Sequence, residues 1–560
     1  MPHAPGPART LLGGRARRSG LLLTAALLAA ALSSCIVGGP EIVSIAPDRN
    51  ASSVSTIAPV RITFDRAVDR RSLASHFSLY PMRDGRALPD ERVSGRMTWD
   101  GARTAVFRHG TLRTNTYYKV VLEAGYRDST GGANGITHNW TFKTESAPSM
   151  TGSTPGAGDT GVDPLADLRL GFSRPMDMAS LGRSIEITPA VPFHVVRDPA
   201  DPRRAILAPV GLLAPRQAYT VTVLGSARDV DGNRLGQAAR IRFQTGDLRP
   251  MSGLVTVSAA PPGSSGSGIW VVDSQGIARR VVKTPVLSFR WSADGVHLLV
   301  QTGPRDWALA LAGTAPVSLP FQADWAVQLP GDGYLALDGT ELERVASDGG
   351  VTPLAGGVLE AALAPDEQRV AFTAATGATT QVRALDLQLN AQYLLLTEPG
   401  AVSGLAWSPD GTRIAYRAQP PDGSLSLIRV ATLAPATGPG TGVITVSAGD
   451  VGPPVWMPDS RRLVFSASVA QTPGGGPKLF LVEPGGTPSA LTATSGLPPG
   501  DLAASAPSPS PDGHQIAFLA PVEGALQAFW MNADGTGVTQ LTGASGWFPY
   551  SCVTLTWSRP

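Results

Sequence analysis

The best metal-binding candidate in the sequence is a short acidic segment in which Asp229, Asp231 and Asn233 occupy alternate positions. Oxygen ligands at this spacing are typical of the start of a calcium-binding loop. Such a loop also needs a Glu that binds the ion through both carboxylate oxygens, and none follows at the required distance. A tight Asp-Gly turn between two strands accounts better for the segment. We therefore predict no metal site and no cofactor.

Residues that could act in nucleophilic or acid–base catalysis are scattered. The Gly-Ser-Ser-Gly-Ser segment at 263–267 does not satisfy the Gly-x-Ser-x-Gly pattern of a nucleophile elbow and is better interpreted as a loop. No two of the seven His residues stand at the spacing of metal ligands. His297 and His514 each follow an Asp-Gly turn, three positions after Asp294 and two after Asp512, which indicates partly exposed strand residues. We predict no catalytic residue and no enzymatic activity.

The first 35 residues have the pattern of a targeting segment. Four arginines (Arg9, Arg15, Arg17 and Arg18) precede an apolar stretch over 21–32, which is too short to span a bilayer comfortably. The apolar stretch ends in Leu-Ser-Ser-Cys at 32–35, which resembles the bacterial lipobox. This resemblance implies a lipid on Cys35, attachment to a bacterial membrane, and a cell-envelope protein that faces the periplasm or the exterior. An ordinary secretory signal that happens to end near a Cys is the alternative.

The second cysteine, Cys552, would then have no partner for a disulfide. An exported chain without disulfides must rely on burial of apolar surface, which this length allows. We predict that Cys552 is a buried apolar residue rather than a reactive thiol.

The charge of the chain is unevenly distributed. The segment 36–250 carries six more Arg and Lys than Asp and Glu, whereas the segment 251–560 carries eight more acidic than basic residues. Neither segment has a clustered basic stripe with interleaved aromatic residues, so we expect no nucleic-acid partner.

Two segments of about a hundred residues align with each other after the signal. Val60-Arg-Ile-Thr-Phe64 matches Leu168-Arg-Leu-Gly-Phe172, and Tyr117-Tyr-Lys-Val-Val-Leu122 matches Tyr219-Thr-Val-Thr-Val-Leu224. Short alternating strands between turns, at this length, predict a β-sandwich. The segments resemble the bacterial Ig-like domains of surface-layer and cell-surface proteins, most closely at 172–177 and 229–233. We place the two domains at 36–146 and 147–248.

A short phrase recurs in the rest of the chain, from 253 to 560. It reads Trp-Ser-Pro-Asp-Gly at 407–411, where Asp410 and Gly411 are the turn residues, and it is followed by an expected strand. Related copies have the turn residues Asp294, Gly295, Asp332, Asp366, Asp459, Asp512 and Gly513. Pro, Asp and Gly favour a tight turn, so each copy predicts a hairpin. Glu367 and Ser460 stand where the pattern has Gly. Repeated hairpins of this kind predict a β-propeller.

The last eight residues repeat the Trp strand without a following hairpin, and the strands near 254–258 and 269–272 lack a first strand. One sheet built from both ends of this region would close the ring. The spacing favours seven blades; six is the alternative if the degenerate copy at Asp332 is not a blade.

The repeats resemble TolB-type, WD40-like propellers, which implies binding of a protein or peptide in the cell envelope. The expected chain is thus all-β, with two tandem Ig-like sandwiches as spacers and a non-catalytic propeller that binds the partner. Two alternatives stay open: an envelope or surface-layer component that contacts polymer through the Ig-like pair, and an accessory of a propeller-associated hydrolase.

Overall fold

A computed structural model describes residues 38–560 apart from 261–267, 332, 424–425, 434–440, 445–447, 470–476, 492–502, 544–547, 549 and 559–560. The chain divides into two compact units, residues 1–147 and 148–560. Among the described residues, none of the helices has the length and apolar character needed to cross a membrane. The proposed lipidation site Cys35 and the turn residue Asp332 lie outside the described residues.

The first unit is a sandwich of two sheets. One sheet has the order β1 (Ile42–Ala46), β3 (Val60–Phe64), β7 (Thr104–His109), β6 (Gly95–Asp100). The other has the order β2 (Ala51–Val54), β9 (His138–Thr144), β8 (Tyr117–Leu122), β4 (Phe77–Arg83), β5 (Arg86–Ala87). Alternate strand residues meet in one apolar core, and a short helix, α1 (Arg70–His76), and a 3-10 turn, η1 (Pro89–Glu91), connect strands.

A second sandwich repeats this plan at the start of the second unit. Its sheets have the orders β10 (Met150–Thr154), β11 (Leu168–Phe172), β14 (Arg204–Pro209), β13 (Phe193–Arg197) and β12 (Ile185–Thr188), β15 (Ala218–Val223), β16 (Ala239–Gln244), with α2 (Met178–Arg183) after β11. Local details are shared: Asp69 and Asp177 accept a hydrogen bond from the backbone at the start of α1 and α2, at 2.7 and 2.6 Å. The sequence alignment of 60–64 with 168–172 is therefore confirmed, but the alignment of 117–122 with 219–224 is wrong by one position. Tyr118, not Tyr117, is the equivalent of Tyr219, because each of these two hydroxyls accepts a backbone hydrogen bond at 2.9 Å and each ring stacks on the Phe paired with it across the sheet.

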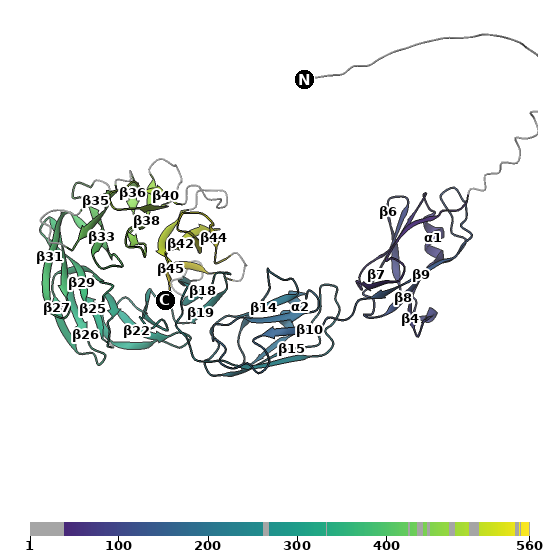
Figure 1. The fold of residues 1–560 in the computed structure, drawn as a ribbon, viewed down its shortest axis with the longest axis horizontal. Coiled ribbons are helices and arrows are strands. Elements are labelled where there is room, and N and C mark those ends of the chain that lie inside the picture. The colour runs from purple at the N-terminus through teal and green to yellow at the C-terminus, as the bar shows by residue number, and fades with distance from the viewer. Residues whose placement is uncertain are drawn as a thin grey trace, which may run out of the picture. The chain divides into compact units, whose positions relative to one another are not determined.

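Seven antiparallel sheets follow, six with four strands and one with five, and form the ring drawn from teal to yellow in Figure 1. Six of them are built from consecutive strands: β20 (Ser288–Trp291), β21 (His297–Gln301), β22 (Asp306–Leu311), β23 (Val317–Gln322); β24 (Trp325–Gln328), β25 (Tyr334–Asp338), β26 (Glu341–Val345), β27 (Val351–Ala355); β28 (Val358–Leu363), β29 (Arg369–Thr376), β30 (Thr379–Asp386), β31 (Ala391–Pro399); β32 (Ala401–Trp407), β33 (Arg413–Gln419), β34 (Leu427–Thr432), β35 (Thr441–Ile444); β36 (Ala448–Val451) with β37 (Val455–Trp456), β38 (Leu463–Val469), β39 (Lys478–Val482), β40 (Ser489–Ala490); and β41 (Ser505–Pro509), β42 (Gln515–Val522), β43 (Ala525–Asn532), β44 (Thr539–Gln540).

The seventh sheet combines both ends of the propeller sequence. Its order is β19 (Ala278–Val282), β18 (Ile269–Val272), β17 (Val255–Ala260), β45 (Ser551–Trp557). In Figure 1 the yellow β45 lies next to the sheet of teal strands β18 and β19. The prediction of a ring closed by the C-terminal strand is confirmed, and the count is seven because the degenerate copy at Asp332 does have its own sheet.

The second sandwich also packs directly on the propeller. The outer face of β14 contributes Ile206 and Ala208 to an apolar cluster with Ile277, which precedes β19. The backbone N–H of Arg280 donates to the carbonyl oxygen of Val210 at 2.7 Å. This sandwich is therefore joined to the composite sheet by packing as well as by the chain.

Candidate functional site

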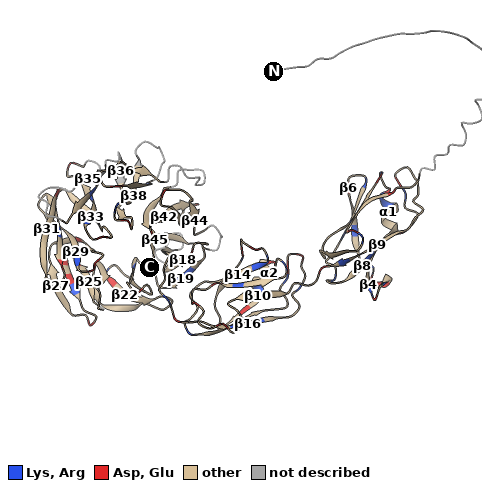
Figure 2. Cartoon of the chain, in the orientation of Figure 1, with Lys and Arg blue, Asp and Glu red and all other residues tan. Residues whose placement is uncertain are grey.

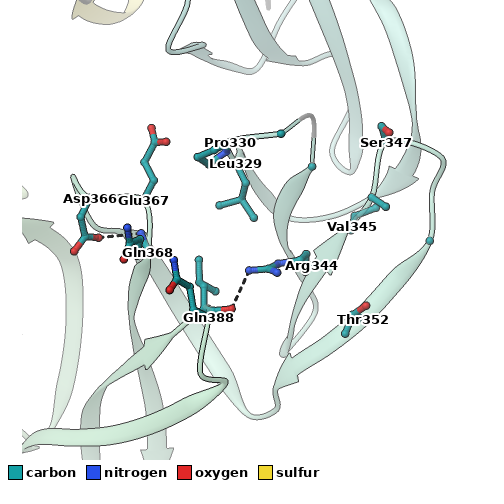
Figure 3. Close-up of a pocket in the computed structure, with 15 residues that line it drawn as sticks. Leu329, Pro330, Arg344, Val345, Ser347, Thr352, Asp366, Glu367, Gln368 and Gln388 are labelled. Atoms are coloured by element: carbon teal, nitrogen blue, oxygen red, sulfur yellow. Dashed lines mark hydrogen bonds between the residues drawn. The ribbon is translucent and has the colours of Figure 1, made fainter.

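A pocket of about 550 Å³ lies between two neighbouring propeller sheets, β24–β27 and β28–β31. Its walls are turns that connect first to second strands and third to fourth strands, and Figure 3 shows their side chains. Seven of the fifteen lining residues have polar side chains, with a guanidinium, two carboxylates, two amides and two hydroxyls: Arg344, Asp366, Glu367, Gln368, Gln388, Ser347 and Thr352. Such a lining can form hydrogen bonds and ion pairs with a ligand.

One wall is the Ala-Pro-Asp-Glu turn, which the Asp366 carboxylate organises. Its Oδ1 accepts hydrogen bonds from the backbone N–H groups of Gln368 and Arg369, at 2.9 and 3.3 Å, and its Oδ2 accepts one from Arg369 Nε at 2.7 Å. Partial burial opposes ionisation, but these hydrogen bonds outweigh it and hold the pKa of Asp366 below its usual value. The ionised Asp366 carboxylate therefore stabilises the turn.

Glu367 occupies a left-handed backbone conformation, with φ of 57°. The equivalent turn positions hold Gly295, Gly411 and Gly513, with φ of 67°, 67° and 73°, where a glycine has no steric cost. Ser460 is the other exception, and its hydroxyl accepts a hydrogen bond from the backbone N–H of Asp410 at 2.9 Å.

The Glu367 side chain makes no hydrogen bond or ion pair with any described residue, and in Figure 3 it extends away from Gln368 and Gln388. A non-glycine residue in this conformation costs about 1–2 kcal/mol. In contrast to Ser460, no contact within the described part of the chain offsets the cost at Glu367. The carboxylate is therefore available to a ligand.

The opposite wall presents Arg344. Its Nη2 donates a hydrogen bond of 3.1 Å across the pocket to the carbonyl oxygen of Leu387 (Figure 3). Next to this carbonyl, the backbone N–H of Gln388 is held by the Asp386 carboxylate at 2.9 Å, so the Gln388 amide side chain is presented from an ordered turn. The pocket thus carries a guanidinium on one side and a carboxylate on the other.

The other predicted turn residues organise turns in the same way. Asp294, Asp410, Asp459 and Asp512 each accept hydrogen bonds from backbone N–H groups two or three residues further on. In two of the turns a serine hydroxyl also donates to the aspartate, which is the largest cause that keeps the pKa of Asp410 and of Asp512 low. The structure distributes these carboxylates over separate sheets and does not bring them together.

The two other residues considered for chemistry, Asp229 and Cys552, have structural roles. Asp229 accepts hydrogen bonds from the backbone of Asp231 and Asn233 and from the Asn233 side chain, at 2.8–3.0 Å, as in a tight turn. Cys552 is buried, and burial raises the pKa of its thiol to about 12. No group of three or more His, Cys, Asp or Glu able to hold a metal occurs in the part of the chain that the structure describes.

Sequence reasoning missed a set of arginine contacts that join neighbouring sheets. The Arg369 guanidinium lies 5.4 Å from the ring centroid of Trp407 in the next sheet and donates to the carbonyl oxygen of Gly411 at 3.2 Å. Arg413 repeats the arrangement one sheet further on, 4.8 Å from the ring of Trp456. The signal was available, because an Arg follows the turn Asp by three positions in both copies.

Comparisons with known proteins agree with the two sandwiches. Residues 37–144 and 145–245 each match the family of bacterial Ig-like domains. No curated protein has a significant sequence match to the chain.

Solved structures that resemble the chain are distant. TolB from Acinetobacter baumannii is 13% identical, with 74% of this chain and 99% of that chain covered and a TM-score of 0.37. Oligogalacturonate lyase from Vibrio parahaemolyticus is 11% identical (52% and 86% covered, TM-score 0.36), and hydrazine synthase from Kuenenia stuttgartiensis is 14% identical (44% and 77% covered, TM-score 0.37). At these values the likenesses assign no activity to this chain. Two segments of the chain thus match bacterial Ig-like domains, and the structure shows a seven-bladed β-propeller after them.

Proposed function

We propose that this chain is a non-catalytic binding protein of the bacterial cell envelope, anchored by a lipid on Cys35, whose propeller holds a protein or peptide partner in the pocket around Glu367. The observation that carries the proposal is the uncompensated left-handed conformation of Glu367 beside a polar pocket. Backbone strain that the local structure does not offset is concentrated at functional sites. A carboxylate on one wall and a guanidinium on the other, together with amides and hydroxyls in the lining, suit a peptide segment that carries a basic group.

Catalysis is not part of the proposal. The pocket holds two carboxylates, but Asp366 is bound by the backbone and by Arg369, so it is not a general base. The remaining groups are Glu367, which we assign to ligand binding, and amides, hydroxyls and Arg344, which can bind and orient a ligand.

Site-specific photo-crosslinking in cells tests the binding face. A photoreactive residue at Gln388, exposed on the pocket, is compared with one at Gln419, exposed at the end of β33. We expect one defined envelope protein or peptide to be attached at 388 and not at 419.

Glu367→Gln should lower the yield of the crosslinked product at 388 about ten-fold, because a hydrogen bond to a charged group contributes about 1.5–3 kcal/mol. Glu523→Gln is the matched control, since Glu523 also has a positive φ, of 51°, in a turn outside the pocket. Equal crosslinking at both positions would refute the proposed face.

Lipidation has its own test. Mass spectrometry of the protein purified from membranes should find an acylated Cys35 at the N-terminus, and a Cys35→Ala variant should lose the acyl mass and the membrane association. A Cys35→Ala variant that stayed fully membrane-bound would contradict the anchor.

A further inference from the structure

Two arginines face each other on the outer surface of the first sandwich. Arg96 on β6 is paired directly with Arg108 on β7, and both are exposed. Neither guanidinium has a hydrogen bond or ion pair with another described residue. Like charges directly opposite each other destabilise an antiparallel strand pair, so this arrangement costs stability in the absence of an anion.

The rest of this sheet face is polar and carries little negative charge. Residues at alternate positions share a face, which places Arg61, Thr98, Thr104 and Val106 beside the arginine pair. The acidic residue of this face on β6, Asp100, is already paired with Arg61 at 3.0 Å. Figure 2 shows the Lys and Arg residues of this sandwich in blue. The two arginines therefore add positive charge that the surrounding strands do not neutralise.

The equivalent face of the second sandwich is apolar and packs against the propeller. Strand register aligns Phe107 with Leu207, and hence Arg108 with Ala208 and Val106 with Ile206. Ile206 and Ala208 are 1% exposed and pack against the propeller through Ile277. Because Arg108 stands where the second sandwich has the small Ala208, this face of the first sandwich is unsuited to packing against an apolar surface and suited to contact with an anionic one.

We propose that this face of the first sandwich, defined by Arg96 and Arg108, binds the anionic headgroups of the phospholipid membrane; the choice of a membrane rests on the proposed lipid on Cys35. Cys35 stands three positions before Gly38, so covalent geometry limits the distance between them to about 11 Å. The start of the described chain is fixed to the sandwich, because Arg66 Nη1 donates to the Gly38 carbonyl oxygen at 3.1 Å and Tyr126 Oη to that of Pro40 at 3.3 Å. An acylated Cys35 would thus keep this sandwich at the bilayer surface.

The chemistry of the pair fits phosphate. A guanidinium binds phosphate oxygens through two parallel N–H donors, and opposed side chains of one strand pair are close enough to contact the same or adjacent headgroups. An anion between them also removes their mutual repulsion. A basic surface on the domain that follows the lipid adds an electrostatic attraction to anionic headgroups.

The test uses the chain from residue 36 onward, which keeps every described residue and lacks the acyl group. Sedimentation with phosphatidylcholine vesicles is compared with vesicles that also contain phosphatidylglycerol. We expect binding to the anionic vesicles alone, weakened by salt because the charges are exposed. Arg96→Gln should lower the partition coefficient about five-fold, and the double variant with Arg108→Gln correspondingly more. The control is Arg83→Gln with Arg86→Gln, an opposed exposed pair in the other sheet in which Arg83 lies 3.9 Å from the Glu91 carboxylate; this variant should leave binding unchanged.

A charge reversal separates binding from folding. Arg96→Glu places an acid opposite Arg108, so this variant should melt at the same or a higher temperature and still lose binding to anionic vesicles. Full binding by the Arg96→Gln, Arg108→Gln variant, an equal loss in the control, or binding to soluble polyphosphate without binding to vesicles would each overturn the proposal. The assay needs neither acylation nor the propeller pocket, so its failure is distinct from a failure of the proposed function.

Discussion

The indole Nε1 of Trp557 donates a 2.8 Å hydrogen bond to the carbonyl oxygen of Ser508. Trp557 ends β45, which pairs with β17 near the start of the propeller, and Ser508 lies on β41 of the sheet that precedes β45 in the ring. The Trp557 side chain therefore ties the composite sheet, in which β45 pairs with β17, to the sheet that precedes it in the ring.

Trp557→Phe should destabilise the propeller, because the Ser508 carbonyl loses its donor and part of a buried ring is removed. We expect a loss of about 1 kcal/mol beyond that of Trp270→Phe, a buried tryptophan whose Nε1 has no hydrogen-bond partner among the described residues. Urea unfolding followed by circular dichroism measures the difference. Removal of 551–560 should cost far more, since β17 would become an unpaired edge, and unchanged unfolding of that truncated chain would disprove closure by β45.

Glu367→Gly should stabilise the fold by about 0.5–1 kcal/mol, because glycine relieves the left-handed strain while its greater freedom in the unfolded chain offsets part of the gain. Ser460→Gly, at the equivalent turn position, should give little or no gain, since it also removes the hydrogen bond from the Asp410 N–H. Differential scanning calorimetry compares the two. The stabilised Glu367→Gly variant should also lose partner capture. A Glu367→Gly variant that was less stable than the wild-type chain and still captured the partner fully would contradict our interpretation of Glu367.

Asp167→Asn should weaken the contact between the second sandwich and the propeller. Asp167 forms an ion pair with Arg279 on β19, whose side chain is 4% exposed, and a buried charge without its partner costs about 3–5 kcal/mol. Asp247→Asn is the control, because its ion pair with Arg216 is largely exposed and should contribute less than about 1 kcal/mol. Hydrogen exchange should show faster exchange across β14 and β19 in Asp167→Asn alone; equal protection in both variants would refute the coupling.

Acid should destabilise the propeller through its turn aspartates. Hydrogen bonds, from the Ser408 hydroxyl first, hold the pKa of Asp410 below its ordinary value of 3.8, so the unfolded state binds a proton more readily than the folded state. The contribution to stability is complete above about pH 4–5 and is lost as pH falls through the lowered folded pKa. Asp410→Asn should flatten this part of the profile of unfolding free energy against pH, and a profile as steep as that of the wild-type chain would argue against the role of Asp410.

Much of the architecture could be predicted from local patterns. Pro, Asp and Gly at fixed positions before an alternating strand specify a hairpin within about ten residues, so the turn around Asp410 and Gly411 followed directly from the sequence. Equal spacing of strands and turns likewise identified the two sandwiches.

The candidate site and both proposals depend on contacts that no local pattern contains. Arg344 and Glu367 come from separate sheets, and Arg96 meets Arg108 only through the strand register. Nothing near Ala208 in the sequence indicates that the propeller covers it. Turn chemistry is decided by neighbouring residues, whereas the environment of a side chain is decided by which distant strands pack against it. In this chain the sequence determined the repeating units, and the tertiary structure decided which of their surfaces are buried and which remain free to bind.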